Sequence, residues 1–221
     1  MYELIVFDWD GTLMDSEATI VNCLQLAAKD LGVAEPEARR ARDVIGLGLH
    51  QAVASLFPEA SEAMVDALAQ QYRKHFLRED REPSPLFPGA PELLQELASR
   101  DYFLAVATGK SRRGLDMELR HTGLGNFFHA TRCADEAFSK PHPQILLDVL
   151  DRLGVDSQRA LVIGDTEYDM QMAANAGSDA IGVSFGVHSP ERLREQGALT
   201  VVEALQQVPE WLAGRQEEGT A

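Results

Sequence analysis

The segment Leu4-Ile5-Val6-Phe7-Asp8-Trp9-Asp10-Gly11-Thr12-Leu13 joins a strongly apolar run to two acidic residues. An uninterrupted apolar run of this length is typical of a strand that is buried on both faces of a parallel sheet. Aspartate and glycine are favoured where a strand ends and the chain turns. We therefore expect a central strand whose carboxyl end carries Asp8 and Asp10.

Similar strand-like runs recur along the chain, with helical patterns between most of them. The strands are expected at 2–9, 102–107, 160–163 and 180–185, with a weaker candidate at 129–132. Helical spacing of apolar residues covers 91–100, 111–122 and 143–153. Strands that alternate with helices predict an α/β fold, a Rossmann-like doubly wound parallel sheet.

One stretch interrupts this alternation. Between the first strand and Pro88-Gly89, about 70 residues have helical patterns and no convincing strand, far more than a crossover of a dozen residues needs. We expect an α/β core of residues 1–15 and 89–221 and an inserted small α-helical cap domain of residues 16–88. The cap would be an all-α subdomain without a chemical role, or a part of the site. Because the insertion begins directly after the Asp8 segment, we favour the alternative in which the cap is part of the site.

Composition excludes several functional classes. The 221 residues carry a net charge of −15, which disfavours binding to nucleic acid or an anionic membrane. No apolar run is long enough to span a membrane, and the first residues do not resemble a secretory signal. Cys23 and Cys133 are far apart and have no metal-ligand spacing, which fits a reducing cytoplasm. We expect a cytoplasmic monomer or homodimer.

Polar residues follow four of the predicted strands. They are Asp8, Asp10, Thr108, Lys140, Asp165 and Asp169. Ligands of open parallel sheets bind at the carboxyl ends of the strands, so these side chains are expected to converge. Clustered carboxylates repel one another unless a cation lies among them, and a set of oxygen ligands without histidine or cysteine favours Mg²⁺ over zinc.

These segments resemble, in order, the four motifs of the haloacid dehalogenase-like (HAD) hydrolase superfamily. The segments are Asp8-Trp9-Asp10-Gly11-Thr12-Leu13, Thr108-Gly109, Lys140-Pro141 and Gly164-Asp165-Thr166-Glu167-Tyr168-Asp169. The helical insertion resembles the small cap of that superfamily, and the whole is similar to its phosphoglycolate phosphatase-like subfamily. Each motif alone is weak evidence, but all four occur in order at strand ends.

The resemblance implies a role for each of these residues. Asp8 would be the nucleophile that forms an acyl phosphate, and Asp10 the general acid and base. Thr108, Gly109 and Lys110 would bind the phosphate at a helix N-terminus, and Lys140 would supply a positive charge to it. The implied Mg²⁺ ligands are Asp8, Asp10, Asp165 and Asp169.

Structural explanations compete with some of these roles. Thr166 and Asp169 also fit a helix-capping pair, which is compatible with a metal role. Thr108 would also cap a helix, and Lys140 would be an ordinary surface lysine before a proline turn. Arg112 lies near the phosphate loop and is a weaker candidate. In the cap, the loop 46–50 precedes a predicted helix, and Leu49 and His50 are the expected substrate contacts.

Three functions remain in competition. The first is hydrolysis of a small phosphorylated metabolite, and the second is a phosphoryl mutase of the same fold. A mutase needs a second, basic phosphate site, and the loop 46–50 has no lysine or arginine. The third is a catalytically silent binding or regulatory module, which the complete set of motifs disfavours. The sequence does not choose among phosphoglycolate, a sugar phosphate and a nucleotide as substrate.

Overall fold

A computed structural model of the chain describes residues 1–218 and contains a six-stranded, wholly parallel sheet. The strand order is β3-β2-β1-β4-β5-β6. The strands are β1 (Leu4–Phe7), β2 (Phe103–Thr108), β3 (Ala130–Cys133), β4 (Ala160–Gly164), β5 (Asp179–Val183) and β6 (Val201–Val202). The predicted doubly wound α/β fold is confirmed, because the chain builds outward from β1 in one direction and then from β4 in the other.

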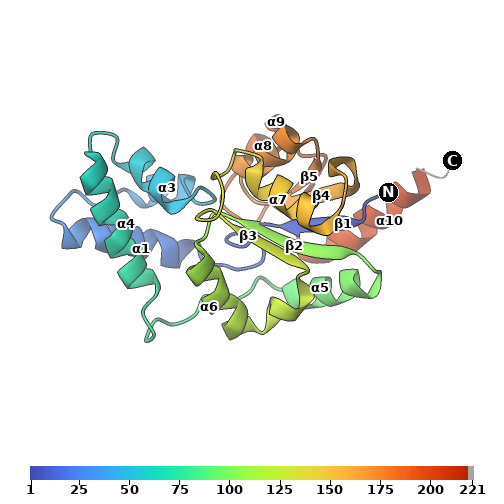
Figure 1. The fold of residues 1–221 in the computed structure, drawn as a ribbon, viewed down its shortest axis with the longest axis horizontal. Helices are drawn as coiled ribbons and strands as arrows, with labels where there is room; N and C mark the ends of the chain where they lie inside the picture. Colours follow the sequence, from blue (N-terminus) through green and yellow to red (C-terminus); the bar gives the residue numbers. More distant parts are fainter. Residues whose placement is uncertain (219–221) are drawn as a thin grey trace.

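Helices cover both faces of the sheet (Figure 1). They are α5 (Ala90–Ser99), α6 (Arg112–Thr122), α7 (Gln144–Leu153), α8 (Glu167–Ala176), α9 (Pro190–Glu195) and α10 (Val208–Glu218). Alternate residues of a strand point to opposite faces. Ile5 and Phe7 accordingly pack with α5, α6 and α10, whereas Leu4 and Val6 pack with α7, α8 and α9. The continuous apolar run of β1 is thus explained by burial on both sides.

The helical insertion forms a cluster of its own at one end of the molecule (Figure 1). It contains α1 (Glu17–Asp30), α2 (Ala38–Asp43), α3 (Leu49–Leu56) and α4 (Glu62–Phe76). Its buried residues, among them Leu24, Val53 and Leu68, form a hydrophobic core apart from the two beside the sheet. The division at residues 16 and 88 stays a prediction.

The chain enters and leaves the insertion through two adjacent segments. Met14 is bridged to Leu86, and the backbone N–H of Asp15 donates to the carbonyl of Pro85 at 2.9 Å. The N–H of Phe87 donates back to the carbonyl of Leu13 at 3.0 Å. This two-stranded connection ends beside Asp10, so it ties the insertion directly to the end of β1.

Most predicted elements are present, with ends that differ by at most two residues from those predicted. The strand β6 was not predicted, because two residues are too short a run to produce a periodic pattern. Three short 3₁₀ helices, at Leu124–Phe127, Ser157–Arg159 and Leu205–Gln207, complete the described chain. None of the helices within residues 1–218 has the length and apolar character of a membrane span.

Candidate active site

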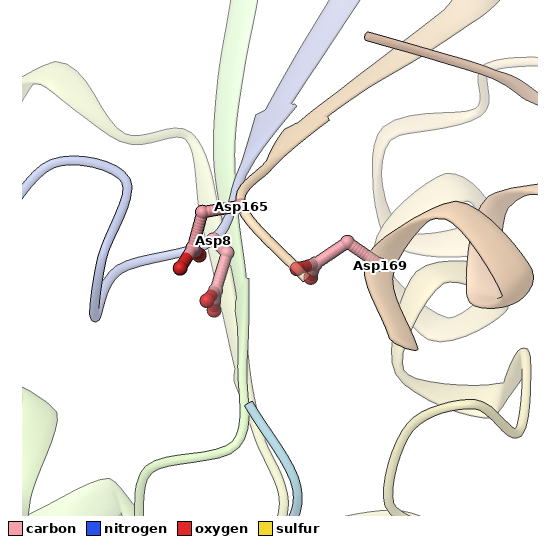
Figure 2. A group of neighbouring side chains, drawn as sticks. All are labelled: Asp8, Asp165 and Asp169. Atoms are coloured by element: carbon pink, nitrogen blue, oxygen red, sulfur yellow. The ribbon is translucent and has the colours of Figure 1, made fainter. Parts of the chain in front are cut away.

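Three acidic side chains converge at the carboxyl ends of β1 and β4 (Figure 2). Asp8 follows β1, Asp165 follows β4, and Asp169 lies in the first turn of α8. One carboxylate oxygen from each lies within 4.8 Å of the others. The backbone N–H of Asp8 donates to the carbonyl of Ile163 at 2.9 Å, which extends the β1–β4 ladder up to this point.

Lys140 is the cation of this cluster. Its Nζ donates to Oδ1 of Asp8 at 2.8 Å and to Oδ1 of Asp169 at 2.6 Å. The side chain is completely buried and the Lys140–Pro141 peptide bond is cis. Lys140 is therefore a residue of the site and not a surface lysine. With three carboxylates and one ammonium group, the cluster keeps two uncompensated negative charges when all are ionised.

This excess negative charge favours the binding of a divalent cation. Burial raises the pKa of Asp8 to about 7. The positive charge of Lys140 opposes this rise, and the negative charge of Asp169 adds to it. Burial and the charge of Asp8 raise the pKa of Asp165 as well. Within the described chain, Oδ2 of Asp8 is buried and has no hydrogen-bond partner. An unpaired carboxylate oxygen among oxygen ligands suits a hard ion such as Mg²⁺.

Neighbouring backbone and side-chain groups fix the orientation of Asp165. Its Oδ1 accepts from Oγ1 of Thr12 at 3.0 Å, and its Oδ2 accepts from the N–H of Val187 at 2.8 Å. Gly11 has φ of +83°, and a Cβ atom at this position would collide with the Asp165 carboxylate. A larger residue would therefore strain the backbone and displace the acidic group.

Asp169 makes the capping contacts considered from the sequence, and it also pairs with Lys140, which the sequence did not predict. Its Oδ2 accepts from the backbone N–H of Thr166 at 3.1 Å and from Oγ1 of Thr166 at 2.6 Å. Its Oδ1 accepts from Lys140. The same carboxylate thus begins α8 and completes the acidic cluster.

Asp10 is not part of the group of three clustered carboxylates. Its Oδ1 accepts from Oγ of Ser16 at 2.5 Å and from Nζ of Lys110 at 2.9 Å. The structure therefore brings together three of the four residues expected as metal ligands, and it places the carboxylate of Asp10 in a separate network.

Lys110 is buried and its ammonium group faces carboxylates. Besides Asp10, its Nζ lies 3.1 Å from Oε2 of Glu118. Oε1 of Glu118 lies 3.6 Å from Arg81, and the ring of Phe76 lies 4.4 Å from the Lys110 ammonium. Glu118 and these two cap-side residues were not predicted. In the sequence, the sign of a buried role for Glu118 is its position three residues after Leu115, which places it on the apolar face of α6.

The insertion lies directly against the phosphate loop expected at Thr108 and Gly109. A Cβ atom on Gly109 would lie 2.5 Å from the carbonyl oxygen of Gly46 and 2.6 Å from that of Leu47. The N–H of Gly48 donates to Oγ of Ser139 at 2.6 Å. Gly109 is thus the residue that lets the loop 46–48 lie directly over the end of β2.

A pocket opens between the insertion and the catalytic edge of the sheet. Asp8, Asp10 and Thr108 form part of its lining, and so does Leu49. His50 is not in the lining, and its side chain is exposed and lies 3.3 Å from Asp66. Of the two cap residues that were expected to contact substrate, the structure therefore places Leu49 in the pocket lining and His50 outside it.

Arg112 is held away from this pocket. Its guanidinium donates to both carboxylate oxygens of Glu136, at 3.2 and 2.9 Å, and to Oγ1 of Thr131 at 2.9 Å. It also lies 3.2 Å from Asp116, one turn later in α6. These contacts join α6 to β3 and give Arg112 a structural role.

Comparisons with known proteins agree with the motifs and with this geometry. Residues 5–183 match the family model described as haloacid dehalogenase-like hydrolase. The chain is 34% identical to "Probable phosphatase IndB" of Dickeya dadantii, over 94% of this chain and 92% of that one. It is 32% identical to a phosphoglycolate phosphatase of Agrobacterium fabrum, over 83% and 81% of the two chains.

A solved structure shows the same arrangement. A hydrolase from Pseudomonas syringae superposes with a TM-score of 0.87 at 25% identity, over 97% of this chain and 99% of that one. The chain therefore belongs to the haloacid dehalogenase-like hydrolases, in their phosphoglycolate phosphatase-like subfamily, and it is an enzyme of the phosphoric monoester hydrolase class.

Proposed function

We propose that this protein is a Mg²⁺-dependent phosphatase that hydrolyses small phosphate monoesters through a phosphoaspartyl intermediate on Asp8. The observation that carries the proposal is the buried cluster of Asp8, Asp165 and Asp169 around Lys140, with Oδ2 of Asp8 unpaired. Asp8, Asp165 and Asp169 would hold the metal, and a bound Mg²⁺ would offset repulsion between these carboxylates and the phosphate.

In the first half of the reaction, a carboxylate oxygen of Asp8 attacks phosphorus and the bond from phosphorus to the leaving oxygen breaks. Asp10, in its protonated form, gives a proton to that oxygen, so the leaving group departs as a neutral alcohol. Lys140 fixes the other oxygen of Asp8. The hydroxyl of Thr108 and the N–H groups that follow it donate to the phosphate oxygens.

In the second half, Asp10 accepts a proton from a water molecule, whose oxygen attacks the phosphorus of the acyl phosphate. The bond between phosphorus and Asp8 breaks, inorganic phosphate leaves, and both carboxyl groups return to their starting states. The ammonium group of Lys110 lies against Asp10. We therefore revise its expected role from phosphate binding to positioning Asp10.

Hydrolysis remains favoured over the mutase. A mutase must hold a second phosphate in the cap, normally with basic residues. Among the described residues that line the pocket, the cations are Arg73 and Lys110, and Lys110 is paired with carboxylates. The family membership and the relatives named as phosphatases argue against the catalytically silent module.

We also propose that residues 16–88 act as a cap that restricts substrates to small phosphorylated metabolites. Its loop 46–48 lies over Gly109, and a cap in this position would exclude water during phosphoryl transfer. Cys23 and Cys133 are free and buried, which is compatible with the cytoplasm. The acidic net charge supports neither nucleic acid nor membrane as a partner, and a monomer or homodimer is expected.

The test is phosphate release from a panel of phosphate esters, with Mg²⁺ and with EDTA, by the native protein and by Asp8→Asn. Loss of a nucleophile normally costs several orders of magnitude in kcat. The variant should therefore be inactive while its circular dichroism spectrum and melting temperature stay close to native. A native protein that hydrolyses no ester in Mg²⁺, or an Asp8→Asn variant that retains more than a few per cent of activity, would refute the proposal.

A further inference from the structure

The pocket above the catalytic residues has apolar walls. Two residues of α1, one turn apart, face it from one side, and two of α4 face it from the other. Further apolar residues come from the loop before α3 and from its first turn. The six that define the space are Ile20, Leu24, Tyr72, Phe76, Ile45 and Leu49. The cavity has a volume of about 70 Å³, so it limits the occupant to a small group.

Few charged groups face this space. In the part of the chain that the structure describes, the charged lining residues are Asp8, Asp10, Arg73 and Lys110. Both aspartates would repel an anionic leaving group. Lys110 already lies within 3.1 Å of Asp10 and of Glu118. Arg73 is an exposed residue of α4 and is the one remaining cation of the described lining.

Burial of a charged group without a partner is strongly unfavourable, whereas burial of apolar surface is favourable. A hydroxy acid such as glycolate would bring a carboxylate into these apolar walls. An uncharged alcohol with a hydrocarbon or aromatic body would not. The rings of Tyr72 and Phe76 stack with centroids 5.6 Å apart, which provides an aromatic wall.

We infer that the leaving group of the natural substrate is an uncharged alcohol with an apolar or aromatic body, seated between α1 and α4. This inference rests on the proposed phosphatase function and names the substrate class of the same site. It differs from the substrate named for the Agrobacterium relative, because phosphoglycolate carries a second anionic group.

A matched pair of esters tests the charge directly. Isobutyl phosphate and 2-phosphoglycolate have leaving groups with the same number and branching of heavy atoms, but only the second has a carboxylate. The native enzyme should show kcat/KM at least about tenfold higher for isobutyl phosphate, because this carboxylate would lack a buried partner. Equal efficiencies, or a preference for phosphoglycolate, would overturn the inference.

A second series tests the apolar walls. Across ethyl, butyl and benzyl phosphate, each additional buried methylene should raise kcat/KM about fourfold. Tyr72→Ala should reduce the ratio of the benzyl to the ethyl value, since it removes part of the aromatic wall. A native enzyme with no dependence on leaving-group size would contradict the inference without the need for any variant.

Arg73 provides the decisive control. If it recognised a carboxylate of the substrate, Arg73→Met would reduce phosphoglycolate hydrolysis far more than isobutyl phosphate hydrolysis. We expect Arg73→Met to behave like Lys74→Met, which changes the adjacent exposed residue that does not line the pocket. A selective loss of phosphoglycolate hydrolysis in Arg73→Met but not in Lys74→Met would contradict the inference.

The outcomes for the two proposals are distinguishable. If no ester is hydrolysed in Mg²⁺, the proposed phosphatase function is wrong, and this inference, which rests on it, is wrong as well. If esters are hydrolysed but the carboxylate-bearing one is preferred, the phosphatase function stands and the apolar leaving group is wrong.

Discussion

Lys110 reaches from the loop after β2 to the carboxylate of Asp10, with its Nζ 2.9 Å from Oδ1 and 3.1 Å from Oδ2. Glu118 lies 3.1 Å from the same ammonium group. All three side chains are buried. Burial disfavours the charged form of Lys110, but the two carboxylates outweigh this effect and raise its pKa. Lys110 therefore stays charged and holds Asp10 in a fixed position.

The first prediction concerns this pair. Lys110→Met should lower kcat/KM, which reports the steps up to release of the leaving group, by about 10²-fold for alkyl phosphates, the lower range of a general-acid contribution, because Asp10 is no longer positioned. The loss should be much smaller with 4-nitrophenyl phosphate, whose leaving group needs little protonation. Kinetics on both ester types check this, with the exposed Lys29→Met as control. Equal losses on both would assign Lys110 to phosphate binding or to folding.

The second prediction concerns the acidic cluster. EDTA should abolish activity and Mg²⁺ should restore it, whereas Ca²⁺ should restore it poorly because it prefers more ligands at longer distances. Mg²⁺ should also raise the melting temperature of the inactive Asp8→Asn protein less than that of the native protein. Full activity after exhaustive dialysis against EDTA would remove the metal from the mechanism.

A variant of Asp165 separates the metal from general electrostatics. Asp165→Asn removes one of the three buried carboxylates, so repulsion in the metal-free protein should decrease. We expect its metal-free melting temperature to be no lower than native, and the increase caused by Mg²⁺ to be lost. Differential scanning fluorimetry with and without Mg²⁺ measures both. An undiminished increase would mean that Mg²⁺ binds elsewhere.

The sequence predicted the fold and the convergence of the motifs because both depend on local patterns. The apolar run of β1 and the acidic residues directly after it place Asp8 at a strand end, and the parallel order then brings Asp165 beside it. The direction of the long Lys110 side chain could not be predicted. It depends on Glu118 and on Phe76, which only tertiary packing brings close.

The third prediction compares two adjacent residues of α3. Leu49 lines the pocket and His50 does not. Leu49→Ala should therefore reduce kcat/KM for the best natural ester by about tenfold, with a smaller loss for ethyl phosphate, because the short ethyl group makes less apolar contact with Leu49. His50→Ala should change neither value. Parallel losses on both esters in Leu49→Ala would mean that the loop serves folding or closure rather than selectivity.

The last prediction concerns Arg112, which the structure assigns to stability. Its guanidinium donates to Glu136, and this hydrogen bond is the main reason that the pKa of Glu136 is lowered. A carboxyl group with a lowered pKa in the folded state stabilises the protein above its ordinary pKa, and this stabilisation is lost as the pH falls through the lowered value.

Glu136→Gln should accordingly cost up to about 1 kcal/mol in the free energy of unfolding at pH 7, the scale of a partly exposed ion pair. The difference from native should shrink as the pH falls below about 4, the region where a free glutamate gains its proton. Urea unfolding at several pH values measures this, with the exposed Glu203→Gln as control. Activity at pH 7 should stay native, since Arg112 and Glu136 lie outside the pocket lining. A destabilisation that persists unchanged to acid pH would show that packing, and not the charge of Glu136, holds α6 to β3.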